Sequence, residues 1–112
     1  MLSKELVAAS SRPLVLSLLA EGDSYGYALL QRIRDVSARE IEWTDGMLYP
    51  VLHRLEAEGL ILSSWKLADN GRERKYYRLT PQGRNALLGE RRQWLAVHTT
   101  LSSLWNLQPS ST

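Results

Sequence analysis

Three cationic side chains lie close together in the stretch NGRERKYY, residues 70–77. Arg72 and Arg74 carry guanidinium groups and Lys75 carries an ammonium group, and these groups bind phosphate oxygens in proteins. The Asn-Gly pair before them is a strong signal for a tight β-hairpin turn. We therefore expect three phosphate-binding cations near the tip of a hairpin, although a charge run alone also fits an ordinary solvated surface.

Positive charge is concentrated in one part of the chain. The net charge of the 112 residues is only +2. Residues 1–65 contain six Lys or Arg and nine Asp or Glu, whereas residues 66–92 contain eight and three. A basic block on a mildly acidic body indicates a surface that meets a polyanion such as a nucleic acid.

Patterns typical of catalysis and metal binding are missing from the sequence. There is no cysteine, which excludes disulfides and thiolate metal sites. His53 and His98 stand apart from other metal ligands, and no nucleophile–base–orienter set or glycine-rich phosphate loop is recognisable. We expect neither an enzymatic activity nor a cofactor. No apolar run reaches the roughly 20 residues of a membrane span, and without a secretory signal pattern the expected location is cytoplasmic.

Three helical patterns precede the cationic hairpin. Apolar spacing predicts helices over residues 6–20, 25–36 and 44–58. Pro13 lies inside the first, so that this helix either kinks there or has its ordered part starting nearby. Asp23 or Ser24 is expected to cap the second helix, and Thr44 the third.

Two strands and a long helix follow these helices. The strands are predicted over residues 60–67 and 74–79, and the helix from Pro81 to about residue 107. A two-stranded hairpin is marginal alone and must pack against the helices. The residues expected to make this contact are Leu60, Leu62, Trp65 and Leu79.

The order of elements predicts a mainly α fold with a two-stranded β-hairpin. Three short helices followed by a hairpin form a winged helix-turn-helix, which we assign to residues 1–80. A C-terminal dimerisation helix is expected over residues 81–107 and a flexible tail over residues 108–112.

Several of these segments together resemble the PadR family of bacterial transcriptional regulators, in its short, single-domain branch. The matching segments are LSLLAEGDSYGYALLQRI, DGMLYPVLHRLEAEGLILSSW, GRERKYYRLTPQG and the Trp-bearing last helix. The resemblance spans roughly residues 14–104. It implies a homodimeric winged-helix repressor that binds double-stranded DNA, with the last helix supplying much of the dimer contact.

The third predicted helix would then be the recognition helix, which enters the major groove. Tyr49 is expected either to contact DNA or to pack in the core. Thr44 would cap the helix or bind a phosphate, and Arg54 would bind a phosphate or pair with Glu58. The complete set of expected DNA-binding residues is Tyr25, Thr44, Gly46, Met47, Tyr49, Pro50, His53, Arg54, Arg72, Arg74 and Lys75.

The remaining tyrosines have different expected roles. The resemblance implies that Tyr25, at the start of the second helix, contacts the DNA backbone, whereas Tyr27 is expected to pack between helices. Tyr76 and Tyr77 are expected to be strand-packing residues. Because successive strand residues point to opposite faces, the neighbouring cations cannot all contact DNA together.

An apolar stripe runs along the last predicted helix. Leu87, Trp94 and Leu101 recur every seven residues, the spacing of a helix-on-helix seam, and Trp105 extends it. Too little protein remains to cover this stripe within one subunit, so we expect a homodimer. A dimer suits a two-fold operator with half-sites about 34 Å apart. The resemblance adds a flat hydrophobic small molecule at the dimer centre, with Trp94 stacking on it or simply packed.

The leading hypothesis is therefore a homodimeric DNA-binding repressor that is released by a small-molecule effector. Two alternatives remain. One is a winged-helix protein-interaction module, and the other is a hydrophobic-ligand binder, both without a direct DNA role.

Overall fold

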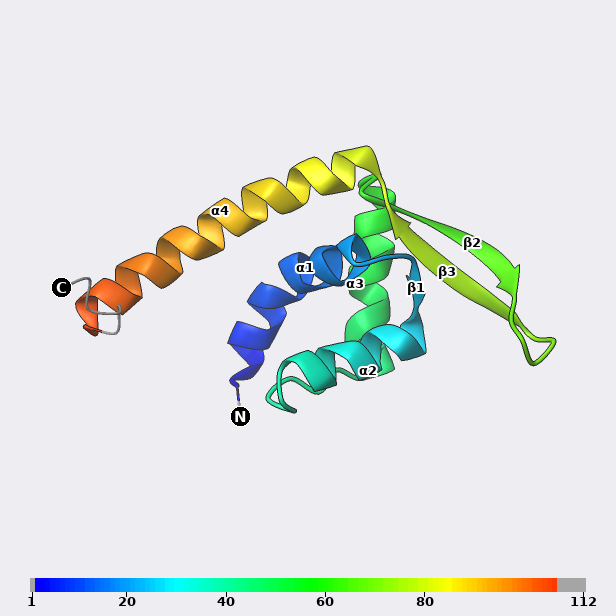
Figure 1. Ribbon diagram of the computed structural model, residues 1–112, viewed down its shortest axis with the longest axis horizontal. Coiled ribbons are helices and arrows are strands. Elements are labelled where there is room, and N and C mark those ends of the chain that lie inside the picture. Colours follow the sequence, from blue (N-terminus) through cyan, green and yellow to red (C-terminus); the bar gives the residue numbers. More distant parts are fainter. Residues whose placement is uncertain (1, 107–112) are drawn as a thin grey trace.

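The computed structural model describes residues 2–106, and these residues form four helices and three strands (Figure 1). In chain order the elements are α1 (Lys4–Ala20), β1 (Ser24–Tyr25), α2 (Gly26–Val36), α3 (Asp45–Ala57), β2 (Ile61–Leu67), β3 (Glu73–Leu79) and α4 (Pro81–Leu104). The predicted tail and the last residue of the predicted final helix lie outside the described residues.

The first helix starts earlier than predicted. Ser3 Oγ accepts a hydrogen bond from Leu6 N at 3.2 Å and caps the first turn, so that α1 begins at Lys4. The helix continues on both sides of Pro13. The alternative in which its ordered part starts near Pro13 is therefore wrong.

The core lies where α1, α2 and α3 meet the base of the sheet. The buried residues that α3 contributes recur at helical spacing and are Leu48, Val51, Leu52 and Leu55. The connector before α3 adds Ile41 and Trp43, which are also buried. Burial of a continuous apolar cluster is the main source of stability for a domain of this size. The other members of the core are Val7, Val15, Leu16, Leu18, Leu19, Leu29, Ile33, Leu60, Ile61, Tyr77, Leu79 and Leu87.

The sheet has three strands in the order β1-β3-β2, all antiparallel. The predicted two-stranded hairpin is thus extended by β1, where Ser24 pairs with Tyr77 and Tyr25 with Tyr76. A strand of two residues leaves no alternation in the sequence, and this is why it was not predicted. The same pairing moves the N-cap of α2 to Tyr25, which makes no side-chain capping bond, in place of the expected Asp23 or Ser24.

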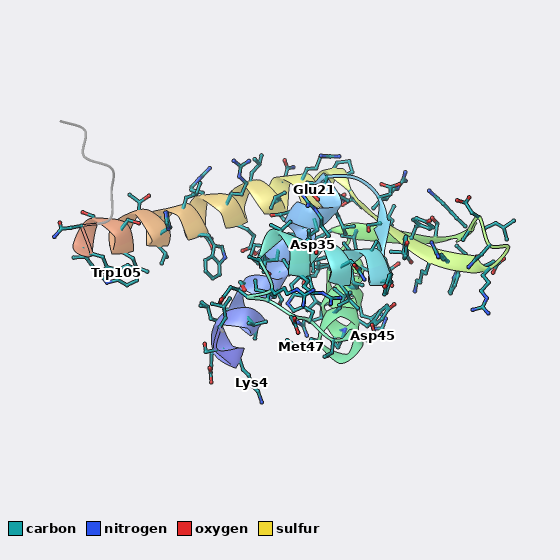
Figure 2. All side chains as sticks on the ribbon, turned by 60° about the horizontal axis from the view of Figure 1, so that its bottom comes forward. Lys4, Glu21, Asp35, Asp45, Met47 and Trp105 are labelled. Carbon is teal, nitrogen blue, oxygen red and sulfur yellow. The ribbon has the colours of Figure 1, made fainter. Side chains whose placement is uncertain are left out.

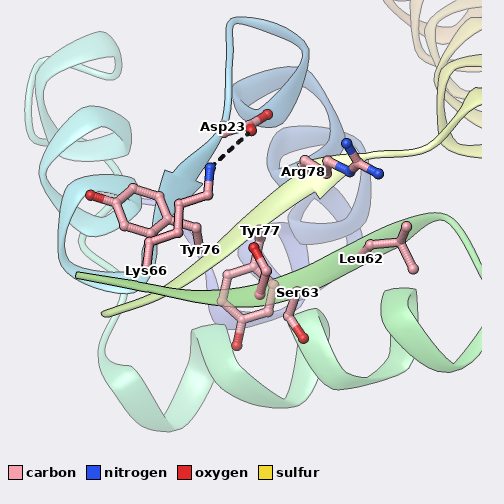
Figure 3. Close-up of a pocket in the computed structure, with 8 residues that line it drawn as sticks. Asp23, Leu62, Ser63, Lys66, Tyr76, Tyr77 and Arg78 are labelled. Atoms are coloured by element: carbon pink, nitrogen blue, oxygen red, sulfur yellow. Dashed lines mark ion pairs between the residues drawn. The ribbon is translucent and has the colours of Figure 1, made fainter. Parts of the chain in front are cut away.

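The hairpin of β2 and β3, residues 61–79, is called the wing below, and it has two distinct faces. Ser63 Oγ donates to a carboxylate oxygen of Glu56 at 2.5 Å, so the face that carries Ser63 is turned toward α3. Figure 3 shows Ser63 and Tyr77 on one side of the sheet and Lys66, Tyr76 and Arg78 on the other. The inner face consists of Ile61, Ser63, Trp65, Leu67, Glu73, Lys75, Tyr77 and Leu79, and the outer face of Leu62, Ser64, Lys66, Arg74, Tyr76 and Arg78.

Only the base of the wing packs against the helices. Leu60 and Leu79 are buried as expected. Leu62 and Trp65 are 47% and 65% exposed, so the expectation that they hold the wing to the body is wrong. The physical reason is visible in Figure 1, where the wing projects beyond the helices and leaves its outer half without a surface to pack on.

The turn of the wing is a three-residue loop. Gly71 N donates to Ala68 O at 2.9 Å, and Ala68 N donates to Arg72 O at 2.7 Å. Gly71 has a φ of +80°, a left-handed conformation that favours glycine. Asn70 Oδ1 accepts from Arg72 N at 3.0 Å. The predicted Asn-Gly hairpin is confirmed, and its geometry places Arg72 directly after the turn.

Arg12 joins three helices through two carboxylates. Its two terminal nitrogens donate to the two oxygens of Glu58, each at 2.8 Å, and its Nε donates to Glu90 at 3.0 Å. Glu58 is the C-cap residue directly after α3, and Glu90 lies in α4. The hydrogen bond from Arg12 holds the pKa of the Glu58 carboxyl below its usual value.

The start of α4 is packed tightly against the sheet. Thr80 Oγ1 accepts from Gly83 N at 3.0 Å and so caps α4, and it donates to Gly59 O at 2.8 Å. Gly83 is buried so closely that an added Cβ would overlap the backbone oxygen of Leu60. From there α4 leaves the body as an extended arm (Figure 1).

We predict that Gly83→Ala destabilises the protein by about 2 kcal/mol, because the new methyl group collides with backbone that cannot yield without moving α4. Gly89→Ala is the matched control in the same helix, since an added Cβ there has open space. It should stabilise the protein by roughly 0.5–1 kcal/mol. Urea unfolding of both variants measures the difference. Equal stabilities would contradict the close packing of α4 on the sheet.

Candidate nucleic-acid interface

One side of α3 is exposed along its whole length. A helix that buries a stripe of leucines against the core must turn its other residues to solvent. The residues turned outward include every position of α3 expected to meet DNA: Gly46, Met47, Tyr49, Pro50, His53 and Arg54. Figure 2 shows Asp45 and Met47 at the N-terminal end of this helix, away from α4.

Thr44 stands at the N-cap position of α3 but makes no side-chain capping bond. The expected side-chain cap is therefore wrong, and the exposed hydroxyl is available to a ligand. The acidic group of Asp45 lies in the first turn, where it interacts favourably with the positive end of the helix dipole.

Tyr49 both packs and faces solvent. Its side chain lies directly against Gly26 at the start of α2, where an added Cβ would overlap the Tyr49 hydroxyl. The residue is nevertheless 37% exposed, and its ring centroid lies 6.4 Å from that of His53. The two alternatives for Tyr49 are thus compatible, because packing against α2 fixes a ring whose exposed edge belongs to the outward surface of α3.

Arg54 forms no close ion pair or hydrogen bond with a carboxylate in residues 2–106, although its charge helps to lower the pKa of Glu58. Its expected alternative partner, Glu58, is instead hydrogen-bonded by both terminal nitrogens of Arg12. The guanidinium of Arg54 is exposed beside the outward face of α3 and remains available to an anion.

The cations of the wing lie on both of its faces. Arg72 is exposed after the turn, and Arg74 on the outer face lies over the ring of Tyr25 at 4.4 Å. Lys75 on the inner face lies 5.7 Å from the ring centroid of Tyr77. In residues 2–106 the ion pairs connect Arg12, Arg32 and Lys66 with carboxylates, and none of them neutralises these three wing cations.

Tyr25 connects the start of α2 to the wing. Its ring meets that of Tyr76 edge to face, with centroids 5.3 Å apart, and Arg74 covers it. Tyr76 and Tyr77 thus pack as expected, and burial raises the pKa of the Tyr77 hydroxyl. Tyr27 was expected between helices, but it is 65% exposed and its hydroxyl accepts from Gln31, one turn further along α2.

The outer face of the wing contains a shallow depression of about 360 Å³ (Figure 3). Lys66 and Asp23 approach to 3.9 Å across it, and Tyr76 and Arg78 complete its rim. Two cations and one carboxylate around an open hollow provide no nucleophile and no paired acid and base. The depression is therefore a surface feature of the wing whose charged side chains can form ionic contacts.

The stripe of α4 is largely uncovered. Leu87 is buried against its own subunit and Trp94 is half-buried, but Leu101 is 37% and Trp105 61% exposed. Figure 2 shows Trp105 at the far end of the arm. The residues that share this exposure along the arm are Leu88, Leu95, Val97, Leu101, Leu104 and Trp105.

Residues 2–106 contain neither a metal-binding cluster nor a membrane-spanning helix. No group of three or more His, Asp or Glu side chains is arranged there to hold a metal ion. In the same range, no helix combines the length and the apolar character needed to cross a lipid bilayer.

Comparison with known proteins gives consistent matches. The model of the transcriptional regulator PadR-like family matches residues 15–88. The transcriptional regulator Rv3488 of Mycobacterium tuberculosis is 40% identical over 89 residues, which cover 80% of this chain and 79% of that protein.

Solved structures agree with this match. A transcriptional regulator from Clostridium thermocellum superposes with a TM-score of 0.82 at 29% identity, covering 92% of this chain and 97% of that one. A PadR family transcriptional regulator from Eggerthella lenta gives a TM-score of 0.73 at 38% identity, covering 90% and 82%. These relatives are named as regulators of transcription and not as enzymes. With an outward-facing third helix and a cationic wing, this chain belongs to the PadR-like family of transcriptional regulators, which are DNA-binding proteins with a winged-helix fold.

Proposed function

We propose that this protein is a homodimeric repressor that occupies a two-fold DNA operator and leaves it when a small hydrophobic effector binds. The observation that carries the proposal is the combination of an open outward face on α3 with three wing cations, Arg72, Arg74 and Lys75, that form no ion pair with a described carboxylate. A structure that needed those cations for its own stability would pair them. Left unpaired on a projecting hairpin, they favour a polyanionic partner.

The outward face of α3 suits the major groove. Gly46 and Pro50 are small and let the helix approach the base edges, where they offer apolar contact to thymine methyl groups. Tyr49 and His53 add polar groups within reach of bases or phosphates. Thr44 and Arg54 at the two ends of this face would hold the helix by phosphate contacts, which fix the register without reading the sequence.

The arm of α4 supplies the dimer. Several large apolar side chains exposed on one helix are uncommon on a monomeric protein and mark an interface. Pairing of two such arms about a two-fold axis would cover Leu101 and Trp105 in both subunits and present two copies of α3 to one duplex. Residues 1–80 would then be the DNA-binding unit and α4 the dimerisation unit.

Trp94 is our candidate for the effector contact. It is half-buried in the single subunit, beside Leu87 and Leu101 on the stripe that would meet its symmetry mate. A flat hydrophobic compound could stack on such rings. Repression would be relieved only if the compound prefers a dimer whose α3 spacing does not match the operator.

The two alternative functions do not account for the cations of the wing. A protein-interaction module or a ligand binder without a DNA role has no need of unpaired cations beside α3. The decisive experiment is a footprint on the DNA upstream of the protein's own gene, followed by affinity measurements on the protected duplex between 50 and 200 mM salt.

Removal of two wing cations should weaken DNA binding through electrostatics. We predict that the double variant Arg72→Ala, Arg74→Ala makes the negative slope of log affinity against log salt shallower by about 2, since each phosphate contact contributes roughly 0.9 to its magnitude. Arg84→Ala, Arg92→Ala removes the same charge from exposed positions of α4 and should leave the slope nearly unchanged. If both double variants change the slope equally, the proposed phosphate contacts of the wing are contradicted.

Two substitutions of Tyr25 distinguish a contact made by its ring from a contact made by its hydroxyl. Tyr25→Phe keeps the ring under Arg74 and beside Tyr76, and we expect DNA affinity within about threefold of the wild type. Tyr25→Ala removes the ring on which Arg74 lies and should lower DNA affinity about tenfold. Fluorescence anisotropy with the protected duplex compares the two. A loss of equal size in both variants would assign the contact to the hydroxyl.

The dimer can be tested at the stripe of α4. Leu101→Glu places one carboxylate per subunit in the proposed seam and should weaken dimerisation by at least a hundredfold, because a buried unpaired charge is costly. Thr99→Glu adds the same charge on the other side of the helix and should have little effect. Sedimentation equilibrium at micromolar concentration gives both constants. A wild-type chain that sediments as a monomer would refute the proposed dimer.

A further inference from the structure

A cavity of about 210 Å³ lies between α1 and α3. Most of its wall is apolar, with Val7 and Val15 on the side of α1 and Val51 on the side of α3. No Asp or Glu takes part in this wall. Sites for small molecules are typically concave and mostly apolar, with a few polar groups that fix the orientation of the ligand. The polar groups of the wall therefore decide which ligand chemistry suits the cavity.

One buried hydrogen-bond donor in this wall has no acceptor. Trp43 is only 7% exposed, and its Nε1 atom is buried without a hydrogen-bond partner among residues 2–106. Buried polar groups in native proteins are almost always paired, and a bound molecule supplies the acceptor where the protein does not. The hydroxyl of Ser11 in the same wall already donates to Ala8 O at 2.8 Å. Trp43 is thus the buried group that asks for an acceptor.

The side of the cavity formed by residues 4–12 of α1 can yield. Pro13 has no N–H, so the carbonyl of Ala9 receives no helical hydrogen bond from it. The hydroxyls of Ser10 and Ser11 donate at 2.8 Å to carbonyls three or four residues earlier, a pattern that bends helices. Four of the six buried residues of α1 come after Pro13, so the part before it has the weaker anchor. A bend at Pro13 would admit a molecule to the cavity.

The ligand that suits Trp43 carries a neutral oxygen. Arg54 belongs to the wall but is exposed, so its charge is already hydrated. A carboxylate would lose its own hydration between apolar walls and would meet a single buried N–H there. A carbonyl oxygen accepts the same hydrogen bond without a net charge. At roughly 30 Å³ for each atom, as for a water molecule, the cavity has room for about seven non-hydrogen atoms.

We infer that this cavity is a binding site for a small neutral carbonyl compound, a ketone or ester of about seven non-hydrogen atoms. Its oxygen accepts from Trp43 Nε1 while its hydrocarbon part packs on the valines of the two helices. The same wall includes Gly46, Met47 and Pro50, so the ligand lies directly behind the outward face of α3. This site is separate from Trp94 on the arm, and it requires neither a duplex nor a dimer.

The probe for the site is methyl butyl ketone, which has the expected size. In a spectrum of backbone and indole N–H groups by heteronuclear NMR, the four tryptophans give four indole signals, and Trp43→Phe identifies that of Trp43. This signal should shift saturably, with half-saturation at about 1 mM for so small a ligand, while the other indole signals stay in place. Hexylamine is the matched control, because it has the same length but ends in a protonated donor. It should leave the Trp43 signal unchanged.

Three variants separate the cavity from the rest of the surface. Ala8→Leu places a larger side chain in the wall at an exposed position and should weaken ketone binding at least tenfold. Ala9→Leu makes the same change at the next exposed position, outside the wall, and should bind like the wild type. Trp43→Phe, followed through the amide signal of Gly46, should lose about fivefold, the value of one neutral hydrogen bond.

Three results would overturn the inference. The first is an indole signal of Trp43 that the ketone does not shift, as expected of a cavity that holds only water. The second is an equal response to hexylamine. The third is a variant Ala8→Leu that binds the ketone as well as Ala9→Leu does. A wild type that binds the ketone but no DNA would refute the proposed function and support this site.

Discussion

The burial of Tyr77 in the central strand is the constraint on which the geometry of this protein depends. A two-stranded hairpin has little stability of its own in water. Here β3 pairs with β1 on one side and β2 on the other, and the ring of Tyr77 is buried to 1% exposure near Tyr49 and Glu56 of α3. The wing therefore has a fixed angle to α3, although Trp65 and Leu67 in its outer half are left exposed. Without that anchor the cations beyond it would have no defined position relative to the outward helix face.

Most of the architecture follows from local patterns that are strong in this sequence. The spacing of Leu48, Leu52 and Leu55 fixes which side of α3 is buried, so its outward residues could be predicted from the same pattern. The Thr80–Pro81 cap and the glycine after Asn70 locate α4 and the hairpin turn. In each case one short stretch contains the whole signal.

The features that escaped prediction depend on residues far apart in the chain. Alternation places Trp65 on the same side as Ile61, but only the extent of the helices decides that it lies beyond their cover. Tyr49 meets Gly26 through tertiary packing that no local pattern reports. The two-residue strand β1 is too short for any periodicity. These three features have one cause in common, since each depends on how elements that are separate in the sequence are placed in space.

The three-way contact of Arg12 has a mechanical consequence. Its side chain is 38% exposed and contributes little stability as an ion pair, yet it connects the end of α3 to the arm. A rigid guanidinium that holds Glu58 with two bonds and Glu90 with a third cannot follow both carboxylates if they separate. Any pivoting of the arm must therefore either move the last turn of α3 with it or break these hydrogen bonds. If two arms pair as proposed, a shift of one arm against the other would reach α3 through Arg12.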